Sequence, residues 1–473
     1  MTTAAYYRHQ MCLLPAFMAM SARGLCVNEP LRQERITALG TEADAIRERV
    51  LPIVEGVKER LREKALLWET KRCTSCHNGK KKKLTCAACG GVGKHETFAF
   101  NLASGRQLAD VLYNGLRLPH RSRDGHTTTD EEALKSLLSY DKSGFVVQAL
   151  RFTKLSTMRE IYERLAPAPD GRVRTVLNPV GTYTGRCSSS EAFYVPHSTN
   201  LQNLPAQAAL RDALYRVREV CVPFHGHTFV YADLSQAEAR VAAVLSDDWA
   251  LLERWQDPAW DLHRWTASAI FCKPEVAITD AERFLGKKCR HALNYGMGYN
   301  KFWRTVNDEA DVTGVSLSQG EAKRIRTAYH ALHPNLDGVW WNRVQATLDK
   351  EERITASHCG WSCSFWPRRD ESGTVDAESL RAAIAWEPQH TIVHHLNEGL
   401  LRLFESEAAW GGEVLLQGHD SVLLSVPSKR TQGAVEAAKA ALERPLCVRG
   451  YTFTIPVETF VSETSWADLR RVV

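Results

Sequence analysis

The chain has 473 residues, of which 44% are hydrophobic and 24% charged, and its formal net charge at pH 7 is +5. These values are ordinary for a globular protein of two or three domains, and so small a charge gives no argument for nucleic-acid binding. No stretch reaches the roughly 20 apolar residues of a membrane span, and the N-terminus lacks a signal-peptide pattern, so no membrane association is expected. Thirteen cysteines without secretory signals favour free thiols and a metal site in a reducing compartment, such as the cytoplasm of a bacterium or a phage-infected host.

The first part of the chain is expected to be mainly helical. Residues 1–67 have a helical composition with a break at 23–30, and residues 31–68 carry both charges throughout, as in a solvated helical hairpin. A further helix is expected near residue 130, where Thr129 or Asp130 can cap its first turn.

Four cysteines form two C-x-x-C pairs that nine residues separate. Each pair can supply half of a tetrahedral thiolate site, so this spacing predicts one bound Zn²⁺. Four successive lysines at 80–83 lie between the pairs, where they are either simply solvated or close enough to contact phosphates. The expected zinc ligands are Cys73, Cys76, Cys86 and Cys89.

Two carboxylates are placed by apolar runs that lie far apart in the chain. Residues 229–231 read as a buried strand that delivers Asp233 at its end, and residues 415–426 read as a hairpin with Asp420 at its tip. If both strands belong to one sheet, the two acids meet at its edge. Such a pair suits two Mg²⁺ ions, roughly 3.5–4 Å apart, that activate an attacking oxygen and stabilise a leaving one.

Glu238 allows two interpretations. Ser235 and Glu238 have the spacing of a capping box, in which the acid satisfies the first turn of the helix expected from residue 235. The second interpretation comes from the family resemblance described below, which implies a role for Glu238 in the active site.

Cationic and aromatic side chains recur at intervals of four in residues 287–299. On one helix this spacing puts neighbouring members on a slowly drifting face, which suits a triphosphate followed by a stacked base. An amphipathic helix with an aromatic stripe would look the same. The residues are Lys287, His291, Tyr295 and Tyr299.

Several segments, in order, resemble the motifs of the family A DNA polymerases, the bacterial DNA polymerase I class. The segment 230–240 resembles motif A, 286–302 resembles motif B, and 415–426 resembles motif C. Four further segments resemble the parts of the family that flank these motifs: 181–190, 200–205, 261–271 and 380–390.

This resemblance implies an α+β, right-hand polymerase fold. It places a thumb region at 1–165 with a zinc-binding insertion at about 70–96, the palm at 166–245 and 352–473, and the fingers at 246–351. It implies a phage- or plasmid-like polymerase domain without its own proofreading domain. Its partners would be primer–template DNA, deoxynucleoside triphosphates and a separate exonuclease or processivity chain.

The resemblance also implies roles for individual residues. Asp233 and Asp420 would be catalytic and hold two Mg²⁺, and Glu238 would exclude a ribose 2′-hydroxyl. The nucleotide-binding residues would be Gln236, Glu238, His263, Lys287, Lys288, His291 and Tyr295. The DNA-binding residues would be Arg186, Tyr299, Arg381, Gln389 and His419.

The chain departs from the family pattern at two informative positions. His291 stands where a Lys is usual, and Lys288, three residues earlier, is predicted to supply the missing charge. Ser421 replaces a second acid after Asp420.

Two alternatives stay open at this point. A single-subunit RNA polymerase shares the two acids, although Glu238 argues against it. A catalytically silent DNA-binding scaffold would not need the acids, and their presence argues against that role. Primer extension with deoxy- or ribonucleotides separates all three.

Overall fold

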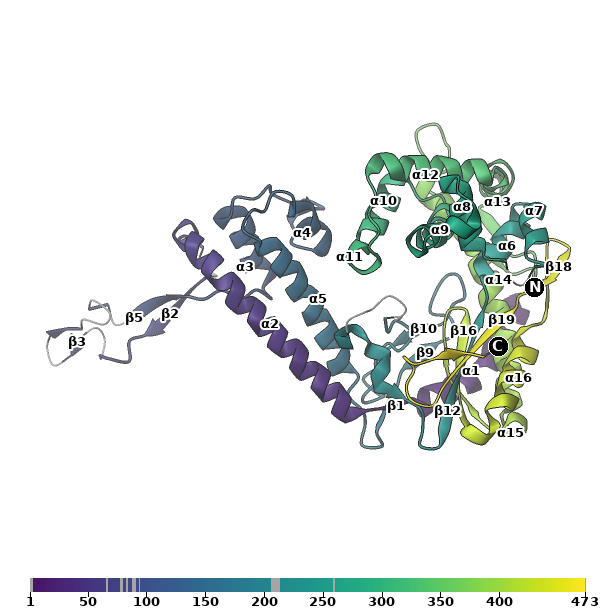
Figure 1. The fold of residues 1–473 in the computed structure, drawn as a ribbon, viewed down its shortest axis with the longest axis horizontal. Coiled ribbons are helices and arrows are strands. Elements are labelled where there is room, and N and C mark those ends of the chain that lie inside the picture. The colour runs from purple at the N-terminus through teal and green to yellow at the C-terminus, as the bar shows by residue number, and fades with distance from the viewer. Residues whose placement is uncertain are drawn as a thin grey trace. The chain divides into compact units, whose positions relative to one another are not determined.

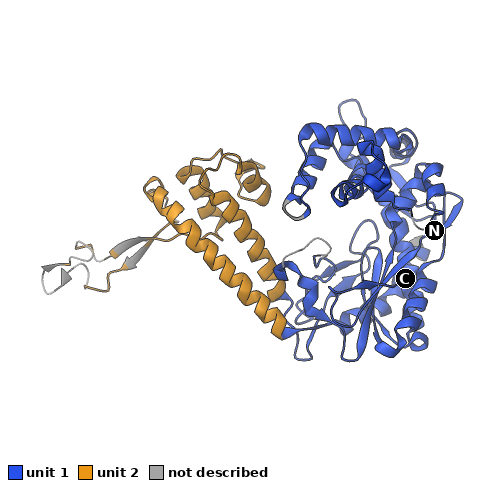
Figure 2. Ribbon diagram, viewed as in Figure 1, with its two compact units in different colours: residues 1–29, 164–473 blue, residues 30–163 orange. Residues whose placement is uncertain are grey.

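The computed structural model describes residues 3–472 except 65–66, 77–79, 82–83, 87–90, 93, 206–212 and 258–259. The chain divides into two compact units (Figure 2). Unit 1 contains residues 1–29 and 164–473, and unit 2 contains residues 30–163.

The first boundary differs from the expected thumb region at 1–165, because residues 1–29 belong to unit 1. Helix α1 (Thr3–Arg23) contacts β15 (Glu413–Gln417), and β1 (Leu25–Val27) pairs with β8 (Arg172–Val173) and β11 (Cys221–Val222). The expected helical break at 23–30 is therefore the point where the chain forms β1 and then leaves unit 1.

A five-stranded antiparallel sheet organises unit 1 (Figure 1). Strand β12 (His227–Leu234) lies at its centre beside β16 (Ser421–Pro427), and most apolar residues of these two strands are buried, as the continuous apolar runs predicted. Helices α1, α14 (Ala377–Glu405) and α16 (Thr431–Leu442) pack against it. In spatial order the strands are β15, β16 (Ser421–Pro427), β12 (His227–Leu234), β19 (Val457–Ser462) and β20 (Arg470–Arg471).

The described part of residues 237–351 in unit 1 is mostly helical, and side-chain caps set where four of the helices begin. Asp248, Asp261, Thr279 and Ser318 each accept a hydrogen bond from the first turn that follows. The helices are α6 (Ala237–Leu245), α7 (Trp249–Arg254), α8 (Leu262–Phe271), α9 (Asp280–Leu293), α10 (Tyr299–Asn307), α11 (Ala310–Thr313), α12 (Gln319–Leu332) and α13 (Asn342–Glu351).

Short hairpins and one short helix complete unit 1. They are β9 (Val176–Asn178) with β10 (Ser188–Ser190), β13 (Arg353–Thr355) with β14 (Ser362–Ser364), β17 (Pro445–Val448) with β18 (Tyr451–Thr454), and α15 (Glu407–Trp410).

Unit 2 is built on two long helices. Buried residues recur every three or four positions on α2 (Glu29–Val57), and Arg32 donates to the Tyr162 carbonyl of α5 (Phe145–Arg164) at 2.8 Å. The remaining elements are β2 (Trp68–Arg72), β3 (Lys80–Lys81), β4 (Leu84–Thr85), β5 (Lys94–Phe98), α3 (Gly105–Ala109), β6 (Ser122–Arg123), β7 (His126–Thr127) and α4 (Glu131–Leu137). Asp130 rather than Thr129 caps α4. In the part of the chain that the structure describes, no helix has the length and apolar character needed to span a membrane.

Candidate active site

Strand pairing brings the two predicted acids together. Asp233 lies directly opposite Ser421 in the β12–β16 register, and the Leu234 amide donates to the Asp420 carbonyl at 2.9 Å. The hairpin turn that carries Asp420 is closed by a hydrogen bond from the Gly418 amide to the Ser421 carbonyl at 2.7 Å. Asp233 and Asp420 are 187 positions apart in the sequence (420 minus 233), yet they share one edge of the sheet.

The electrostatics of this edge favour a bound cation. Burial, and then the charge of Asp420, raise the pKa of Asp233 to about 8. Burial, and then the charge of Glu238, raise the pKa of Asp420. Buried carboxylates that repel one another become stable as anions when a divalent cation lies between them, so this donor set fits Mg²⁺.

Two residues that sequence reasoning missed also belong to this edge. Glu458 lies opposite Asp233 on β19, and its charge contributes to the raised pKa of Asp233. The Tyr231 hydroxyl donates to Asp233 Oδ2 at 3.2 Å. Neither residue belongs to a recognisable motif. The sequence could have indicated their role only through their positions on strands that lie next to the acids.

Glu238 is a hydrogen-bond acceptor within the site rather than a helix cap. Helix α6 begins at Ala237, and its N-cap residue, Gln236, makes no side-chain cap bond, so the alternative of a capping box is wrong. Glu238 instead accepts from Arg186 Nη2 and, at 2.9 Å, from the Tyr295 hydroxyl. Gln236 accepts from Trp255 Nε1 at 3.1 Å.

Helix α9 carries the predicted phosphate-binding cations, but the four-residue repeat does not continue along one helix. Helix α9 ends at Leu293, Gly296 has a left-handed backbone (φ 72°), and α10 begins at Tyr299. A glycine is suited to this turn because it adopts positive φ at little cost. Tyr295 therefore lies in the turn after α9, and Tyr299 is the first residue of a second helix.

The predicted role of Lys288 must be revised. Its Nζ lies 2.6 Å from Glu309 Oε1, so its charge is already compensated. Lys287 is exposed, and its charge lowers the pKa of Asp233 and of His291. Lys287, rather than Lys288, is therefore the helix α9 lysine whose charge acts on Asp233.

The two histidines near these cations are expected to be neutral. Desolvation, and then Lys287, lower the pKa of His291. Burial, and then Arg283, lower the pKa of His263 to about 3.

Helices α8 and α9 pack closely at Gly286. A Cβ at Gly286 would lie 2.2 Å from the His263 carbonyl oxygen, so only glycine permits this close contact of α8 with α9.

The residues with predicted DNA contacts are spread over several elements of unit 1. Arg381 and Gln389 lie on α14, and Arg381 is exposed with its side chain close to Gly296. Tyr299 and His419 are also exposed. Arg186 is half-buried in its ion pair with Glu238.

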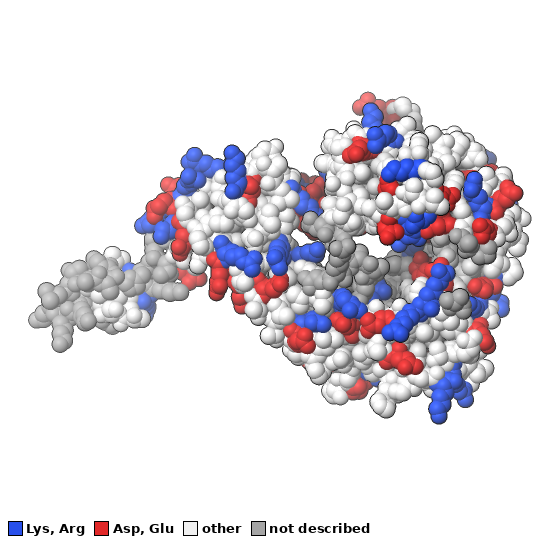
Figure 3. All heavy atoms as spheres, viewed as in Figure 1, with Lys and Arg blue, Asp and Glu red and all other residues white. Residues whose placement is uncertain are grey.

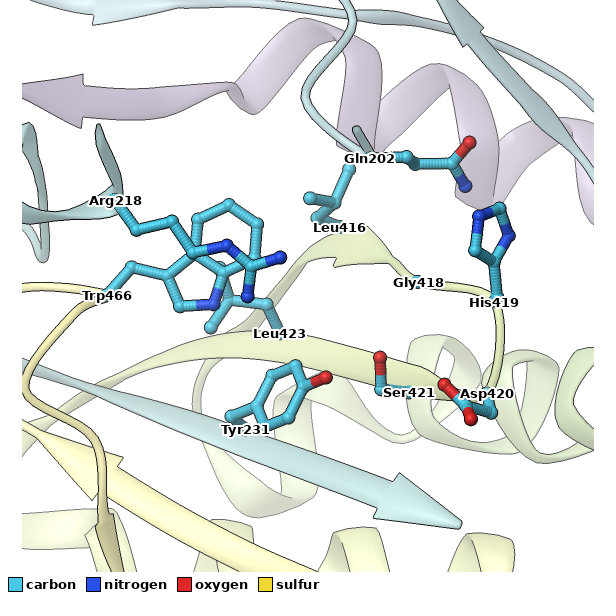
Figure 4. A pocket seen from close by; sticks show the side chains of 10 residues that line it. All are labelled: Gln202, Arg218, Tyr231, Leu416, Gly418, His419, Asp420, Ser421, Leu423 and Trp466. Atoms are coloured by element: carbon cyan, nitrogen blue, oxygen red, sulfur yellow. The ribbon is translucent and has the colours of Figure 1, made fainter. Parts of the chain in front are cut away.

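A pocket with a volume of about 140 Å³ lies beside Asp420 (Figure 4). Tyr231, Asp420 and Ser421 line one part of it, and Arg218 stacks over the Trp466 ring at 4.2 Å in another. The full lining is Gln202, Arg218, Tyr231, Leu416, Gly418, His419, Asp420, Ser421, Leu423 and Trp466.

The face drawn in Figure 3 has basic and acidic side chains intermixed on each unit. This mixture agrees with a net charge of only +5. Local cations such as Lys287, rather than one broad basic patch on that face, are therefore the groups to test for phosphate contact.

The cysteine pairs lie in unit 2, within the segment between β2 and β5. Cys73, Cys76 and Cys86 have sulfur atoms within 4.8 Å of one another, and the Cys73 and Cys86 sulfurs are 3.9 Å apart. The fourth expected ligand, Cys89, lies outside the described residues. Three converging thiols fit a zinc site.

Comparison with known proteins agrees with this geometry. The family model described as DNA polymerase family A matches residues 77–468. The chain is 27% identical to the thermostable DNA polymerase I of Thermus aquaticus over 378 residues, which is 76% of this chain and 41% of that protein. It is 30% identical to the DNA polymerase I of Mycobacterium bovis over 387 residues, which is 79% of this chain and 39% of that protein. The chain thus spans about two fifths of the length of these curated relatives.

Comparison with solved structures identifies the fold. The solved structure described as the POL domain of Pol1 from M. smegmatis in complex with DNA primer-template and dNTP matches with a TM-score of 0.73 and 22% identity, covering 97% of this chain and 70% of that one. The fold is therefore that of a family A polymerase domain, with mixed helix and sheet. With a family model that matches most of its length, this chain belongs to DNA polymerase family A.

Proposed function

We propose that this chain is a template-directed DNA polymerase that adds deoxynucleotides to a primer 3′ end. The observation that carries the proposal is the pairing of Asp233 with Asp420 across β12 and β16. In the proposed polymerase, unit 2 is the thumb and residues 246–351 are the fingers. The five-stranded sheet and the helices that pack against it are the palm. The setting expected from the cysteine content, a reducing cytoplasm, stays a prediction.

Asp233 and Asp420 would hold two Mg²⁺, which supply activation of the attacking oxygen and stabilisation of the leaving one. In the reaction the primer 3′-oxygen bonds to the α-phosphorus, the bond from that phosphorus to the bridging oxygen breaks, and pyrophosphate leaves. Lys287, His263 and His291 are proposed to contact the triphosphate, because they lie on α8 and α9, and the charge of Lys287 is felt by Asp233.

Glu238 is proposed to lie beneath the incoming sugar, where its carboxylate excludes a 2′-hydroxyl. Its bonds from Arg186 and Tyr295 hold the carboxylate in one position. Tyr295, Tyr299, Arg381, Gln389 and His419 are proposed to contact the base pair and the DNA strands.

The direct test is primer extension with purified protein, supplied with deoxynucleotides or with ribonucleotides. Template-dependent extension that prefers deoxynucleotides is the expected result. A preference for ribonucleotides would favour an RNA polymerase, and the absence of extension under all metal conditions would favour a DNA-binding scaffold.

Lys287→Ala should slow single-turnover nucleotide incorporation more than Lys288→Ala does, by about tenfold or more relative to that variant. The reason is that the charge of Lys287 acts on Asp233, whereas the charge of Lys288 is compensated by Glu309. Removing one charge-assisted phosphate contact costs roughly 1.5–3 kcal/mol, or about 10- to 100-fold. Rapid-quench kinetics at saturating nucleotide measures the two rates, and an equal or larger loss for Lys288→Ala would contradict the revised assignment.

The incorporation rate should show no histidine-like fall between pH 6.5 and 8.5. The pKa of His291 is lowered from its ordinary value of about 6.5, so the ring is mainly neutral from the start of this range and its titration lies mostly below it. The measurement is the single-turnover rate against pH for the wild type and for His291→Gln. A fall in the wild type that is absent from His291→Gln would show that protonated His291 takes part.

A zinc site at Cys73, Cys76, Cys86 and Cys89 is proposed in unit 2. Cys73→Ser with Cys86→Ser should remove one zinc per chain and make the segment between β2 and β5 cleavable by proteases, because the thiolates hold it together. Metal analysis and limited proteolysis measure both effects. Cys12→Ser, at an exposed thiol on α1, is the control and should change neither. Unchanged zinc content in the double variant would exclude the site.

A further inference from the structure

A second group of potential metal ligands lies in unit 1, away from the two acids. His358 and Cys359 occupy the loop between β13 and β14, and His390 and His394 lie on α14. One imidazole nitrogen each of His358 and His394 and the sulfur of Cys359 all lie within 4.8 Å of one another. His390 Nε2 lies 3.7 Å from the same sulfur. Two segments thus bring two imidazoles and one thiol into one group, and a third imidazole, that of His390, lies beside the thiol.

The spacing on α14 favours joint coordination. His390 and His394 are separated by four residues on one helix, which places both rings on the same face. The same i, i+4 pair supplies two of the zinc ligands in helices of the H-E-x-x-H type.

Hydrogen bonds fix which nitrogen of two rings carries the proton. The Thr184 carbonyl can only accept, so His390 Nδ1–H donates to it at 2.9 Å, and His390 Nε2 keeps its lone pair. The Thr391 hydroxyl donates to the Glu387 carbonyl at 2.7 Å, so at 3.2 Å it accepts from His358 Nδ1–H. Both Nε2 atoms therefore present lone pairs, as metal-bound imidazoles do when an outer partner holds the other nitrogen.

The same rings leave buried nitrogen atoms without partners. Among the described residues, His358 Nε2 and His394 Nε2 are buried and make no hydrogen bond. His394 is only 6% exposed, so solvent does not readily supply a partner. A buried polar atom without a partner destabilises the fold, because it has lost its hydrogen bonds to water. A core that only needed packing would place apolar side chains here, so two such atoms beside a thiol indicate a missing shared partner.

We propose that His358, Cys359, His390 and His394 form a second zinc site, which joins the β13–β14 loop to helix α14. Zn²⁺ is the ion that a set of three imidazoles and one thiolate suits best. Burial lowers the pKa of His358 to about 2 and those of His390 and His394 to about 4, so the rings are neutral, as ligands must be. Binding would release the Cys359 thiol proton to solvent and draw the ligand atoms closer together, since metal–ligand bonds of roughly 2.0–2.3 Å set their spacing.

The site would brace the part of α14 on which Gln389 lies. Trp386 stacks on His390 with ring centroids 4.9 Å apart, and His9 of α1 stacks on His394 at 4.6 Å. Zinc at this point would fix α1, α14 and the β13–β14 loop together without contacting the reacting groups. Its expected role is structural.

The test uses the full chain with the four cysteines of unit 2 (Cys73, Cys76, Cys86 and Cys89) changed to Ser, titrated with Zn²⁺ and with Co²⁺. One metal per chain should still bind, and bound cobalt should show tetrahedral d–d bands with a sulfur-to-cobalt charge-transfer band. Adding Cys359→Ser should remove the charge-transfer band, and adding His394→Ala should weaken binding by about 100-fold or more.

Cys363→Ser is the matched control, because this thiol lies on β14 near the cluster but its sulfur bonds the Ser364 carbonyl. It should leave the stoichiometry and the cobalt spectrum unchanged. If the chain without the unit 2 cysteines binds no cobalt, or if its spectrum survives Cys359→Ser, the site does not exist. The first test, cobalt binding by the chain that lacks only the unit 2 cysteines, leaves the four proposed ligands unchanged. Its result therefore does not depend on whether a variant of those ligands folds.

Discussion

Asp233→Asn and Asp420→Asn are each expected to lower the single-turnover rate of primer extension by about 10³-fold or more. Each change removes a metal-ligating oxygen charge from the sheet edge where β12 meets β16. A bound divalent ion contributes several kcal/mol to the stabilisation of the transition state, and every 1.36 kcal/mol is tenfold in rate. Rapid-quench extension of a labelled primer measures the loss.

Primer–template affinity should change little in the same variants, since duplex binding depends mainly on phosphate contacts elsewhere. Glu371→Gln, at an exposed turn carboxylate, is the matched control and should retain the full rate. Extension by either Asn variant within about tenfold of the wild type would contradict the two-metal assignment.

Glu238→Ala is expected to reduce discrimination against ribonucleotides by about 100-fold or more. The carboxylate is held by Arg186 and Tyr295, so it cannot move aside for a 2′-hydroxyl, and Ala leaves room for that group. The ratio of kcat/KM for deoxy- and ribonucleotides on one template measures the change.

Tyr295→Phe is the graded variant for the same prediction. It removes the 2.9 Å hydrogen bond to Glu238 but keeps the carboxylate and the ring, so it should lower discrimination less than Glu238→Ala does. Discrimination that is unchanged in Glu238→Ala would mean that the carboxylate serves only its ion pair with Arg186.

The local parts of the fold could be predicted because neighbouring residues determine them. The break between α1 and α2, the strand that ends near Asp233 and the hairpin that carries Asp420 follow from apolar runs, capping residues and turn residues. The domain boundary could not be found in this way. Residues 1–29 join unit 1 because β1 pairs with strands about 150 and 200 positions away.

Within the site, residue types were readable from sequence but their partners were not. The spacing of Ser235 and Glu238 suggested a capping box, in which Glu238 would bond the start of its own helix. In the structure Glu238 instead bonds Arg186, which lies 52 positions earlier. The repeat of Lys287, His291, Tyr295 and Tyr299 suggested one helix, yet the backbone of Gly296 ends it.

The sequence by itself determined the family resemblance, the two candidate acids, the cysteine spacing and some of the helices, because each depends on residues that are close in the chain or on motifs read in order. Only the tertiary structure decided that Lys288 is compensated by Glu309, that Glu458 lies beside Asp233, and that two segments bring His358 and His394 together. The physical reason is that an ion pair or a ligand cluster depends on distances between side chains from separate elements. Those distances are set by strand register and helix packing over the whole unit.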